Sequence, residues 1–223
     1  WFDCNLIRFR AGRPEKFGGW GKLLSATYQG TARALHNFIS LAGTKYLGIG
    51  THFKYYIVEN NDAFNDITPI RKTVGAGQTD TTATTFAKVG NDDATITVTN
   101  NSHGAVQNDF VTFSGAASLG GNITAAVLNQ EYQIATVTDG NTYTIEAKDT
   151  SGNTVLANSS DSGTGGGSVV STYQINTGLD AYVSSTGWGA NSWGSSGWGS
   201  TTPLSAANQL RIYTLDRSET YEY

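Results

Sequence analysis

The middle of the chain places threonine at every second position between apolar residues, and this alternation narrows the possible folds more than any other feature. Residues 95–99 read TITVT, so Ile96 and Val98 lie on one side of an extended chain and the threonines on the other. A helix, with 3.6 residues per turn, would not keep this separation. Similar patterns predict further strands at residues 109–114, 132–138 and 141–146.

The composition agrees with a β-rich fold. Gly, Ser, Thr and Asn supply 93 of the 223 residues, and charged residues only 14%. Strands and turns use such residues, whereas helical bundles depend on Ala, Glu, Lys and Leu. The 38% of hydrophobic residues can form a core, which argues against disorder. A single cysteine, Cys4, excludes an internal disulfide framework and a cysteine-rich zinc site. The predicted class is all-β.

The N-terminal third predicts an antiparallel meander. Three β-rich runs follow one another at residues 45–51, 52–58 and 64–69, with a polar turn before the last. Residues 31–42 fit helical spacing as well as a strand, and we favour the strand because Gly30 and Gly43 bracket the run. We therefore expect this third to belong to a body made of β-sheets.

Charge changes abruptly along the chain. Residues 1–72 carry ten basic and five acidic residues, net +5, whereas residues 73–210 carry two basic and ten acidic ones, net −8. Such a step suggests a module boundary. We expect a body over 1–75, an inserted β-sandwich or barrel of roughly 95 residues over 76–172, and a return to the body over 173–223.

Local signals within the insert predict three smaller features. Asn122 is placed to cap a short helix over residues 123–128, and residues 138–141 read TDGN, a hairpin turn. Residues 158–168 are polar and glycine-rich, which predicts a flexible loop without core-forming residues. The glycines at 163–167 lack the lysine and the following helix of a phosphate-binding loop.

Residues for catalysis or metal binding are sparse. His36, His52 and His103 are far apart, without zinc-ligand spacing, and His103 before a glycine favours a turn-stabilising role. Residues 91–93 and Asp109 offer oxygen ligands for calcium, but turn chemistry explains them equally well or better. The sequence predicts no enzyme, and no catalytic, cofactor-binding or metal-binding residue.

Two groups of residues are candidates for binding surfaces. Arg8, Arg10 and Arg13 alternate with apolar residues and, with Trp20, favour an inter-subunit interface over nucleic-acid binding because the whole chain is acidic. Farther along, tryptophans recur every fifth residue, a period of neither helix nor strand, so they lie on turns. This array is either a sugar-stacking surface or packing against neighbouring strands; its members are Trp188, Trp193 and Trp198.

Several stretches resemble one family. Residues 8–20 read RFRAGRPEKFGGW, which looks like the opening of the tail nozzle proteins of short-tailed bacteriophages, also called tail tubular protein B. Residues 46–51 (YLGIGT), residues 66–71 (DITPIR) and the Gly-Trp-Gly array before 210–213 are also similar. Residues 103–116 resemble a β-module common in phage virion proteins.

The resemblance implies a virion structural protein with no catalytic residues to transfer. It implies a partial β-propeller-like body in a homo-oligomeric, hexameric ring below the portal and adaptor. Genomic DNA would cross the lumen without specific binding. The absence of Met suggests a piece of a longer chain, and no stretch approaches the length of a membrane-spanning segment. A receptor- or glycan-binding module is the alternative, and a polysaccharide-degrading enzyme, which would need paired carboxylates at a cleft, is a weaker one.

Overall fold

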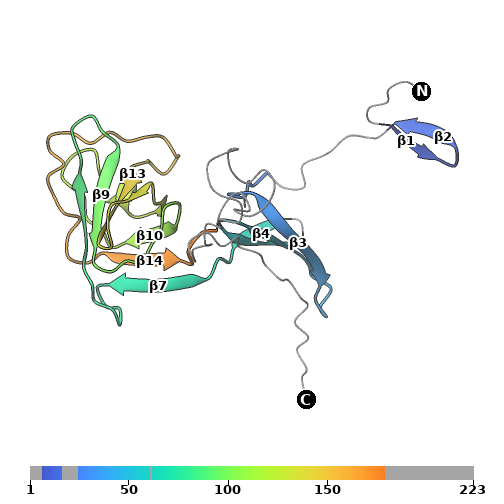
Figure 1. Cartoon of the computed structure of the whole chain (residues 1–223), viewed down its shortest axis with the longest axis horizontal. Coiled ribbons are helices and arrows are strands. Elements are labelled where there is room, and N and C mark those ends of the chain that lie inside the picture. The colour runs from blue at the N-terminus through green and yellow to red at the C-terminus, as the bar shows by residue number, and fades with distance from the viewer. Residues whose placement is uncertain (1–6, 17–24, 61, 179–223) are drawn as a thin grey trace, which may run out of the picture.

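The computed structural model describes residues 7–16, 25–60 and 62–178. These residues form antiparallel sheets with one helix of four residues, so the predicted all-β class is confirmed. They make a two-stranded hairpin, a four-stranded sheet and a two-layered sandwich, which Figure 1 shows in chain order from blue to orange.

The sandwich consists of two four-stranded sheets. One has the order β11 (Glu131–Gln133), β10 (Phe110–Ser114), β14 (Val170–Gln174), β7 (Ile70–Gly75). The other has the order β12 (Thr136–Val137), β13 (Thr142–Glu146), β9 (Thr95–Asn100), β8 (Thr84–Lys88). Alternation explains the layering, because every second residue of each long strand points to the shared interior.

The interior of the sandwich is one continuous core drawn from both sheets. Ile96 and Val98 of β9 are fully buried, as their alternation predicts. The rings of Phe86 and Phe113 meet edge to face across the layers, with their centroids 5.0 Å apart. The hydroxyl groups of Tyr143 and Tyr173 lie 3.0 Å apart in the same interior. The two sheets are therefore held together by direct contact between their inner faces.

The strands that enter and leave the sandwich are neighbours. β7 pairs with β14 antiparallel, with Thr73 opposite Thr172. The chain thus enters and leaves the sandwich on adjacent strands, and the insertion of the sandwich into a larger body stays a prediction. The strand over residues 70–75 lies in the sandwich, whereas the predicted module boundaries assign it to the body. The charge step at residue 72 falls within this strand.

A third four-stranded sheet, which we call the flank sheet, precedes the sandwich in the chain. It has the order β3 (Ala32–Ile39), β4 (Lys45–Thr51), β5 (Tyr55–Glu59), β6 (Ala63–Asp66). The meander is as predicted, and the ambiguous run 31–42 forms a strand. A propeller needs several such sheets; the described residues of the flank contain one, so the propeller stays a prediction.

Two local predictions within the sandwich are wrong. The single strand expected at 132–138 is instead two short strands, β11 and β12, which belong to different sheets. The helix α1 (Ala125–Leu128) starts later than expected, because Thr124 caps it by accepting a hydrogen bond from the Val127 N–H. The Asn122 side chain donates instead to the Leu156 carbonyl.

The glycine-rich segment 158–168 is not the coreless loop that its composition predicts. Asp161 is buried and its carboxylate accepts hydrogen bonds from backbone N–H groups of Gly121 and Ile123, at 2.8 and 3.0 Å. Gly165 packs so closely against Phe86 that a Cβ atom there would collide with the ring, and its φ of +86° favours glycine. The segment closes the core, and its glycines permit that close approach.

Candidate functional site

The candidate interface residues near the N-terminus lie on a two-stranded hairpin, which we call the arm. It consists of β1 (Ile7–Arg10) and β2 (Arg13–Lys16), paired antiparallel with Arg10 opposite Arg13. Ala11 and Gly12 form the two-residue loop with φ of +50° and +74°. Positive φ at both loop residues is the mark of a type I′ turn, whose twist matches that of paired strands.

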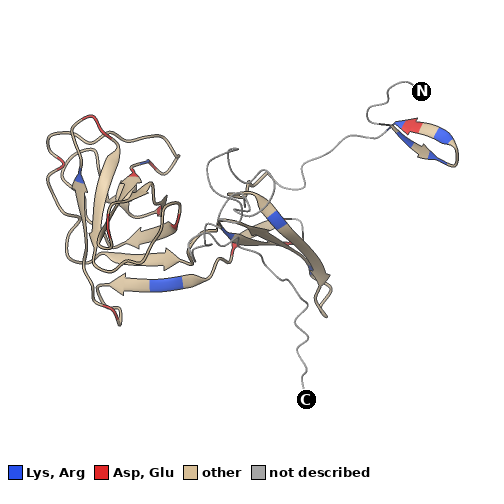
Figure 2. Cartoon of the chain, viewed as in Figure 1, with Lys and Arg blue, Asp and Glu red and all other residues tan. Residues whose placement is uncertain are grey.

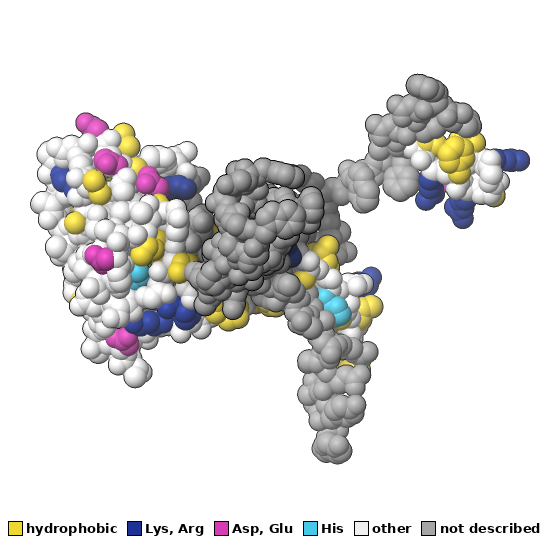
Figure 3. Space-filling view, in the orientation of Figure 1, with side chains coloured by type: hydrophobic (Ala, Val, Ile, Leu, Met, Phe, Trp, Pro, Cys, Tyr) yellow, Lys and Arg dark blue, Asp and Glu magenta, His cyan; other side chains and the backbone are white. Residues whose placement is uncertain are grey.

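The two faces of the arm differ in chemistry. Directly opposite residues share a face, so the register places Ile7, Phe9 and Pro14 on one side, together with Lys16 opposite Ile7. The other side carries Arg8, Arg10, Arg13 and Glu15. Figure 3 shows hydrophobic side chains gathered on the arm beside basic ones, and Figure 2 shows the basic strand positions. The arm is an amphipathic hairpin.

The sequence places the predicted interface on the charged side of the arm. All eight strand residues are exposed, and the Arg8 Nε donates to the Glu15 carboxylate at 2.9 Å. Both side chains are about half exposed, so this ion pair contributes little stability. Trp20 lies outside the described residues. The interface role of Arg8, Arg10 and Arg13 stays a prediction.

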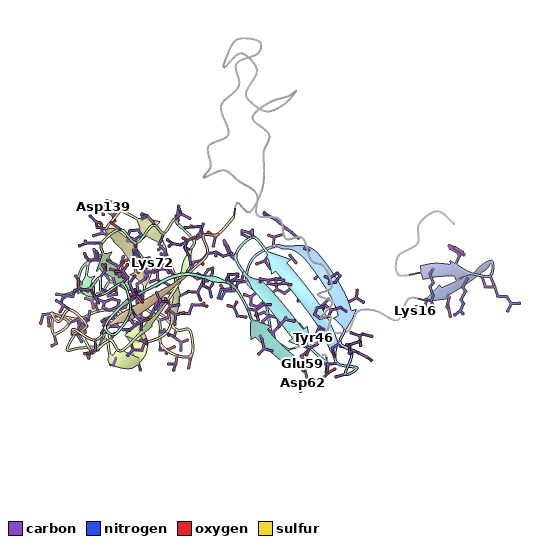
Figure 4. All side chains as sticks on the ribbon, turned by 90° about the horizontal axis from the view of Figure 1, so that it is seen from below. Lys16, Tyr46, Glu59, Asp62, Lys72 and Asp139 are labelled. Atoms are coloured by element: carbon purple, nitrogen blue, oxygen red, sulfur yellow. The ribbon has the colours of Figure 1, made fainter. Side chains whose placement is uncertain are left out.

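The flank sheet also has one apolar face. The register aligns Ile49 of β4 with Tyr56 of β5, and both are buried together with Val58. The same face continues onto β3, where Leu35 lies opposite Ile49, yet Leu35 is 67% exposed and Ile39 57%. The apolar face is therefore well covered in the middle of the sheet and open along β3. Figure 4 labels Tyr46 and Glu59, which pair at one end of the opposite face.

β3 is also an edge strand. In the part of the chain that the structure describes, it has a strand neighbour on one side only, and its eight residues make it the longest strand. The other edges of the four-stranded sheets are shorter: β6 has four residues, β11 three, β12 two and β8 five with Lys88, while the six-residue β7 carries Arg71 and Lys72. Short length and charged residues usually protect an edge strand from pairing with another chain. β3 is longer than the other edges, and Arg33 is its one Lys, Arg, Asp or Glu residue.

A buried lysine joins the flank sheet to the sandwich. Lys54, in the tight turn between β4 and β5, is 2% exposed. Its Nζ lies 2.6 Å from a carboxylate oxygen of Asp66 and 2.6 Å from one of Glu131, so it connects β6 to β11. It also lies 4.5 Å from the centre of the Phe110 ring. The Gln174 amide donates to Glu131 at 3.1 Å.

This junction brings the carboxylates of Asp66 and Glu131 together, and the pKa of Asp66 is opposite in direction to that of a general acid in glycoside hydrolysis. A general acid at such a site requires a raised pKa. Burial tends to raise the pKa of Asp66, but hydrogen bonds from Lys54 and from Thr68 outweigh it, and the pKa is lowered. Asp66 is held as an ion-paired carboxylate, which suits a structural link between modules.

Two other polar candidates, His103 and Asp109, serve turns and loops. His103 is buried; its Nδ1 accepts from the Ala105 N–H and its Nε2 lies 3.0 Å from the Asp139 carbonyl, which confirms its turn-stabilising role. Burial lowers the pKa of His103. The Asp109 carboxylate accepts from the backbone N–H groups of Val106 and Thr177, and so is used by the loops rather than presented to a cation.

A cleft of about 420 Å³ lies beside the junction. Its lining includes Gln29 of the flank and Glu131, Glu146 and Asp149 of the sandwich. The aromatic residues in the lining, Phe110 and Tyr132, are only 2% and 4% exposed and offer little ring surface for stacking on a sugar. Within residues 7–16, 25–60 and 62–178 no group of three or more acidic, histidine or cysteine residues is arranged to hold a metal ion, and no helix is long and apolar enough to cross a membrane.

The second predicted surface, the array of Trp188, Trp193 and Trp198, lies outside the described residues, so its role stays a prediction. The sequence does not predict the junction, because Lys54 and Glu131 are 77 residues apart and Lys54 looks like any other basic residue of the N-terminal third. A lysine inside an aromatic strand-like run, HFKYY, is the only local hint.

Comparison with known proteins gives little further information. No protein-family model matches the chain, and no curated protein matches it. Among solved structures, the phage phi92 endosialidase is similar over 63% of this chain and 18% of its own, at 15% sequence identity and a TM-score of 0.31. The chain thus spans less than a fifth of that protein. A likeness of this size carries no argument about fold or function.

Proposed function

We propose that the chain is a structural subunit of a phage tail, part of the nozzle of a short-tailed bacteriophage and located in the virion. The observation that carries the proposal is the arm: residues 8–16 of the nozzle-like motif fold into a hairpin whose eight strand residues are all exposed. An isolated two-stranded hairpin is marginally stable in water, so such an arm is built to contact another surface.

The partners follow from the same proposal. The subunits form a homo-oligomeric ring, hexameric as in the family that the motif resembles, and stack against the adaptor and other tail proteins. DNA crosses the lumen without specific binding. The acidic sandwich favours this, because a wall that binds phosphates tightly would slow the passage of DNA. We expect Arg8, Arg10 and Arg13 to face other subunits rather than the channel.

The chemistry of the described residues favours a structural role over catalysis. The buried carboxylates are used as acceptors within the fold: Asp161 by a loop, Asp109 by two turns. Asp66 and Glu131 are paired with Lys54. Groups already saturated by the fold are poor general acids and bases.

Electron microscopy of purified phage particles tests the proposal. Averaged tails should contain this chain as repeated copies in a ring on the tail axis, and mass spectrometry of the particles should find its peptides. Light scattering of the purified full chain should show an oligomer. A chain absent from particles, or one that forms single peripheral fibres, would overturn the nozzle function.

The glycan-binding alternative depends on the tryptophan array. Its test is binding to a glycan array by the full chain and by the Trp193→Ala and Trp198→Ala variants. Binding that disappears in these variants favours the alternative, whereas binding that survives both substitutions removes the array as its basis. The cleft is a poor second location because its aromatic rings are buried.

A further inference from the structure

The amino group of Lys54 is enclosed between two carboxylates and an aromatic ring. Its Nζ lies 2.6 Å from an oxygen of Asp66 and 2.6 Å from one of Glu131, and 4.5 Å from the centre of the Phe110 ring. The side chain is only 2% exposed, so protein atoms replace the water that normally surrounds a lysine. Removal of water is one of the ways in which proteins turn lysine into a nucleophile.

The two oxygens of the Asp66 carboxylate have different partners. Oδ1 accepts hydrogen bonds from the backbone N–H of Thr68, at 2.9 Å, and from the Thr68 hydroxyl. Oδ2 faces the Lys54 Nζ. Two donors on one oxygen stabilise the negative charge that this oxygen acquires when a nucleophile adds to the carboxyl carbon. The Asp66 carboxyl group is therefore arranged to accept a nucleophile, with Oδ2 as the oxygen that leaves.

Glu131 lies beside the same amino group and is placed to carry protons. Its Oε1 is 2.6 Å from the Lys54 Nζ, within the reach of a general base. The Gln174 amide donates to this oxygen at 3.1 Å and to the Asp66 Oδ2 at 3.5 Å, so it holds the two carboxyl groups near each other. A proton that Glu131 takes from Nζ can therefore pass to the leaving oxygen of Asp66.

We propose that Lys54 and Asp66 condense to an isopeptide bond, with Glu131 as the catalytic residue that transfers the protons. A bond forms between Nζ and the carboxyl carbon, the bond from that carbon to Oδ2 breaks, and Oδ2 leaves as water. The ammonium group gives up two protons, which both end on Oδ2, and Glu131 is a carboxylate before and after. No atom changes its oxidation state, and no co-reactant is needed.

The pairing that keeps these groups from acting on an external substrate also holds them for reaction with one another. Groups fixed in contact react as if at effective concentrations on the order of 10⁵ M or more. The pKa of Asp66 is lowered, so the ion pair is the starting form, and the acid dependence of the pair is a property of this form. Both carboxyl side chains are about a third exposed, which gives the released water a way out.

The bond would tie the β4–β5 turn to the last residue of β6. It closes a loop that contains β5 and β6, next to the point where the chain passes from the flank sheet into the sandwich. With Cys4 as its single cysteine, the chain cannot form an internal disulfide, whereas an amide cross-link needs no second thiol and no oxidising compartment. The inference goes beyond the proposed function and does not depend on a location in the virion.

Mass spectrometry of the full chain tests the bond. After incubation of the folded chain at neutral pH, its intact mass should lie one water below that of the sequence. Trypsin does not cleave after an acylated lysine, so the digest should contain residues 46–71 as one peptide, uncleaved after Lys54 and lighter by one water. Further cleavage after Glu59 opens the loop, and segments 46–59 and 60–71 should stay joined.

Three variants assign the roles. Lys54→Met should keep its full sequence mass. Glu131→Gln keeps the size of the side chain but cannot carry a proton, so it should lose the water much more slowly while it retains the circular dichroism spectrum of the parent. Lys72→Met is the matched control, because it removes a more exposed lysine that also pairs with a carboxylate, Asp80, at 3.1 Å. It should lose the water as the parent does.

The outcomes leave the proposal open to refutation. A folded parent chain that keeps its full sequence mass overturns it. A loss of water with segments 46–59 and 60–71 separate after both cleavages also overturns it, because the loss then arises elsewhere, as in succinimide formation at an aspartate. An equally fast loss of water in Glu131→Gln overturns the catalytic role of Glu131.

Discussion

The sandwich and the flank sheet are both built from four-stranded antiparallel sheets, but they cover their apolar faces differently. In the sandwich, the inner faces of two sheets cover one another, and Ile96, Tyr143 and Tyr173 are completely buried. The flank sheet has a small core around Val58, and its apolar face opens toward Leu35. A sheet that a second layer covers can be independent, whereas a single sheet needs a partner. The difference leaves the flank sheet, and not the sandwich, with an apolar face that is partly open in the described residues.

The largest expected effect comes from separating the two regions. A fragment of residues 69–175 should fold by itself and melt cooperatively, because its core is self-contained. A fragment of residues 25–69 should not, since about 45 residues with one open face cannot bury enough apolar surface. Circular dichroism melting curves of both fragments check this. A cooperative, monomeric transition in the smaller fragment would remove the comparison.

Within the sandwich, the glycine-rich segment should behave as part of the core. Asp161 accepts hydrogen bonds from four backbone N–H groups at 2.8 to 3.1 Å, from Asn158, Gly121, Asn122 and Ile123. They outweigh the effect of burial, so the pKa of Asp161 is lowered. Asp161→Ala leaves these groups without their acceptor and should lower the free energy of unfolding by about 3 kcal/mol.

Denaturant unfolding of the full chain measures this loss. The matched control is Asp149→Ala, because Asp149 accepts similar turn hydrogen bonds, from Ser151 and Asn153, on the surface. We expect a much smaller change there. Equal losses in the two variants would mean that segment 158–168 is not a structural part of the sandwich.

The junction should be the next most sensitive site, because it links the two regions. Lys54→Met removes the ammonium group between Asp66 and Glu131 and leaves two partly buried carboxylates facing each other. We expect a loss of about 2–3 kcal/mol, below the usual cost of breaking a buried pair because both carboxylates are about a third exposed. Lys72→Met, which breaks the more exposed pair with Asp80, should cost little.

The junction also predicts a dependence on pH. The pKa of Asp66 is lower in the folded protein than its ordinary value of 3.8, so its contribution to stability is present above that value and is lost as the pH falls through the folded pKa. Asp66→Asn should therefore reduce the fall in the free energy of unfolding between about pH 5 and pH 2, the range around the ordinary carboxyl pKa. Denaturant titrations at a series of pH values measure this fall. An unchanged pH dependence in Asp66→Asn would show that other carboxylates control the acid sensitivity of the fold.

The smallest effect concerns the contact between the two sheets of the sandwich. The hydroxyl of Tyr143 lies 3.0 Å from that of Tyr173, and burial raises the pKa of Tyr143 well above 10 and that of Tyr173 to about 12. Tyr143→Phe should cost about 1 kcal/mol. A double-mutant cycle with Tyr173→Phe measures the coupling, and zero coupling would mean that the hydroxyl pair contributes no net stability.

Much of the fold could be predicted from local sequence, and the failures have a common cause. The alternation of residues 95–99 predicts β9, and the TDGN turn predicts the hairpin that leads into β13. The prediction of a single strand over residues 132–138 failed because these residues divide between two sheets. That division depends on pairing with strands that are distant in the sequence. The prediction of a flexible loop over residues 158–168 failed because the composition is that of a loop, whereas contacts with Phe86 and Gly121 fix the segment in place.

The same division applies to the candidate sites. The sequence predicts a basic N-terminal strand pattern, but only the hairpin register separates the arginine face from the face of Ile7 and Phe9. The sequence also contains Lys54, Asp66 and Glu131 without any sign that they meet. These three residues come into contact only because the sandwich packs against the flank sheet.

By itself, the sequence determined the all-β class, the strand positions with strong alternation and the change from a basic to an acidic segment at residue 72, because these follow from local periodicity and charge. Only the tertiary structure decided which strands are neighbours, which edge stays open and which lysine is buried. Those outcomes depend on pairings between residues that are distant in the chain, and a local pattern fixes which face of a strand is buried but not what buries it.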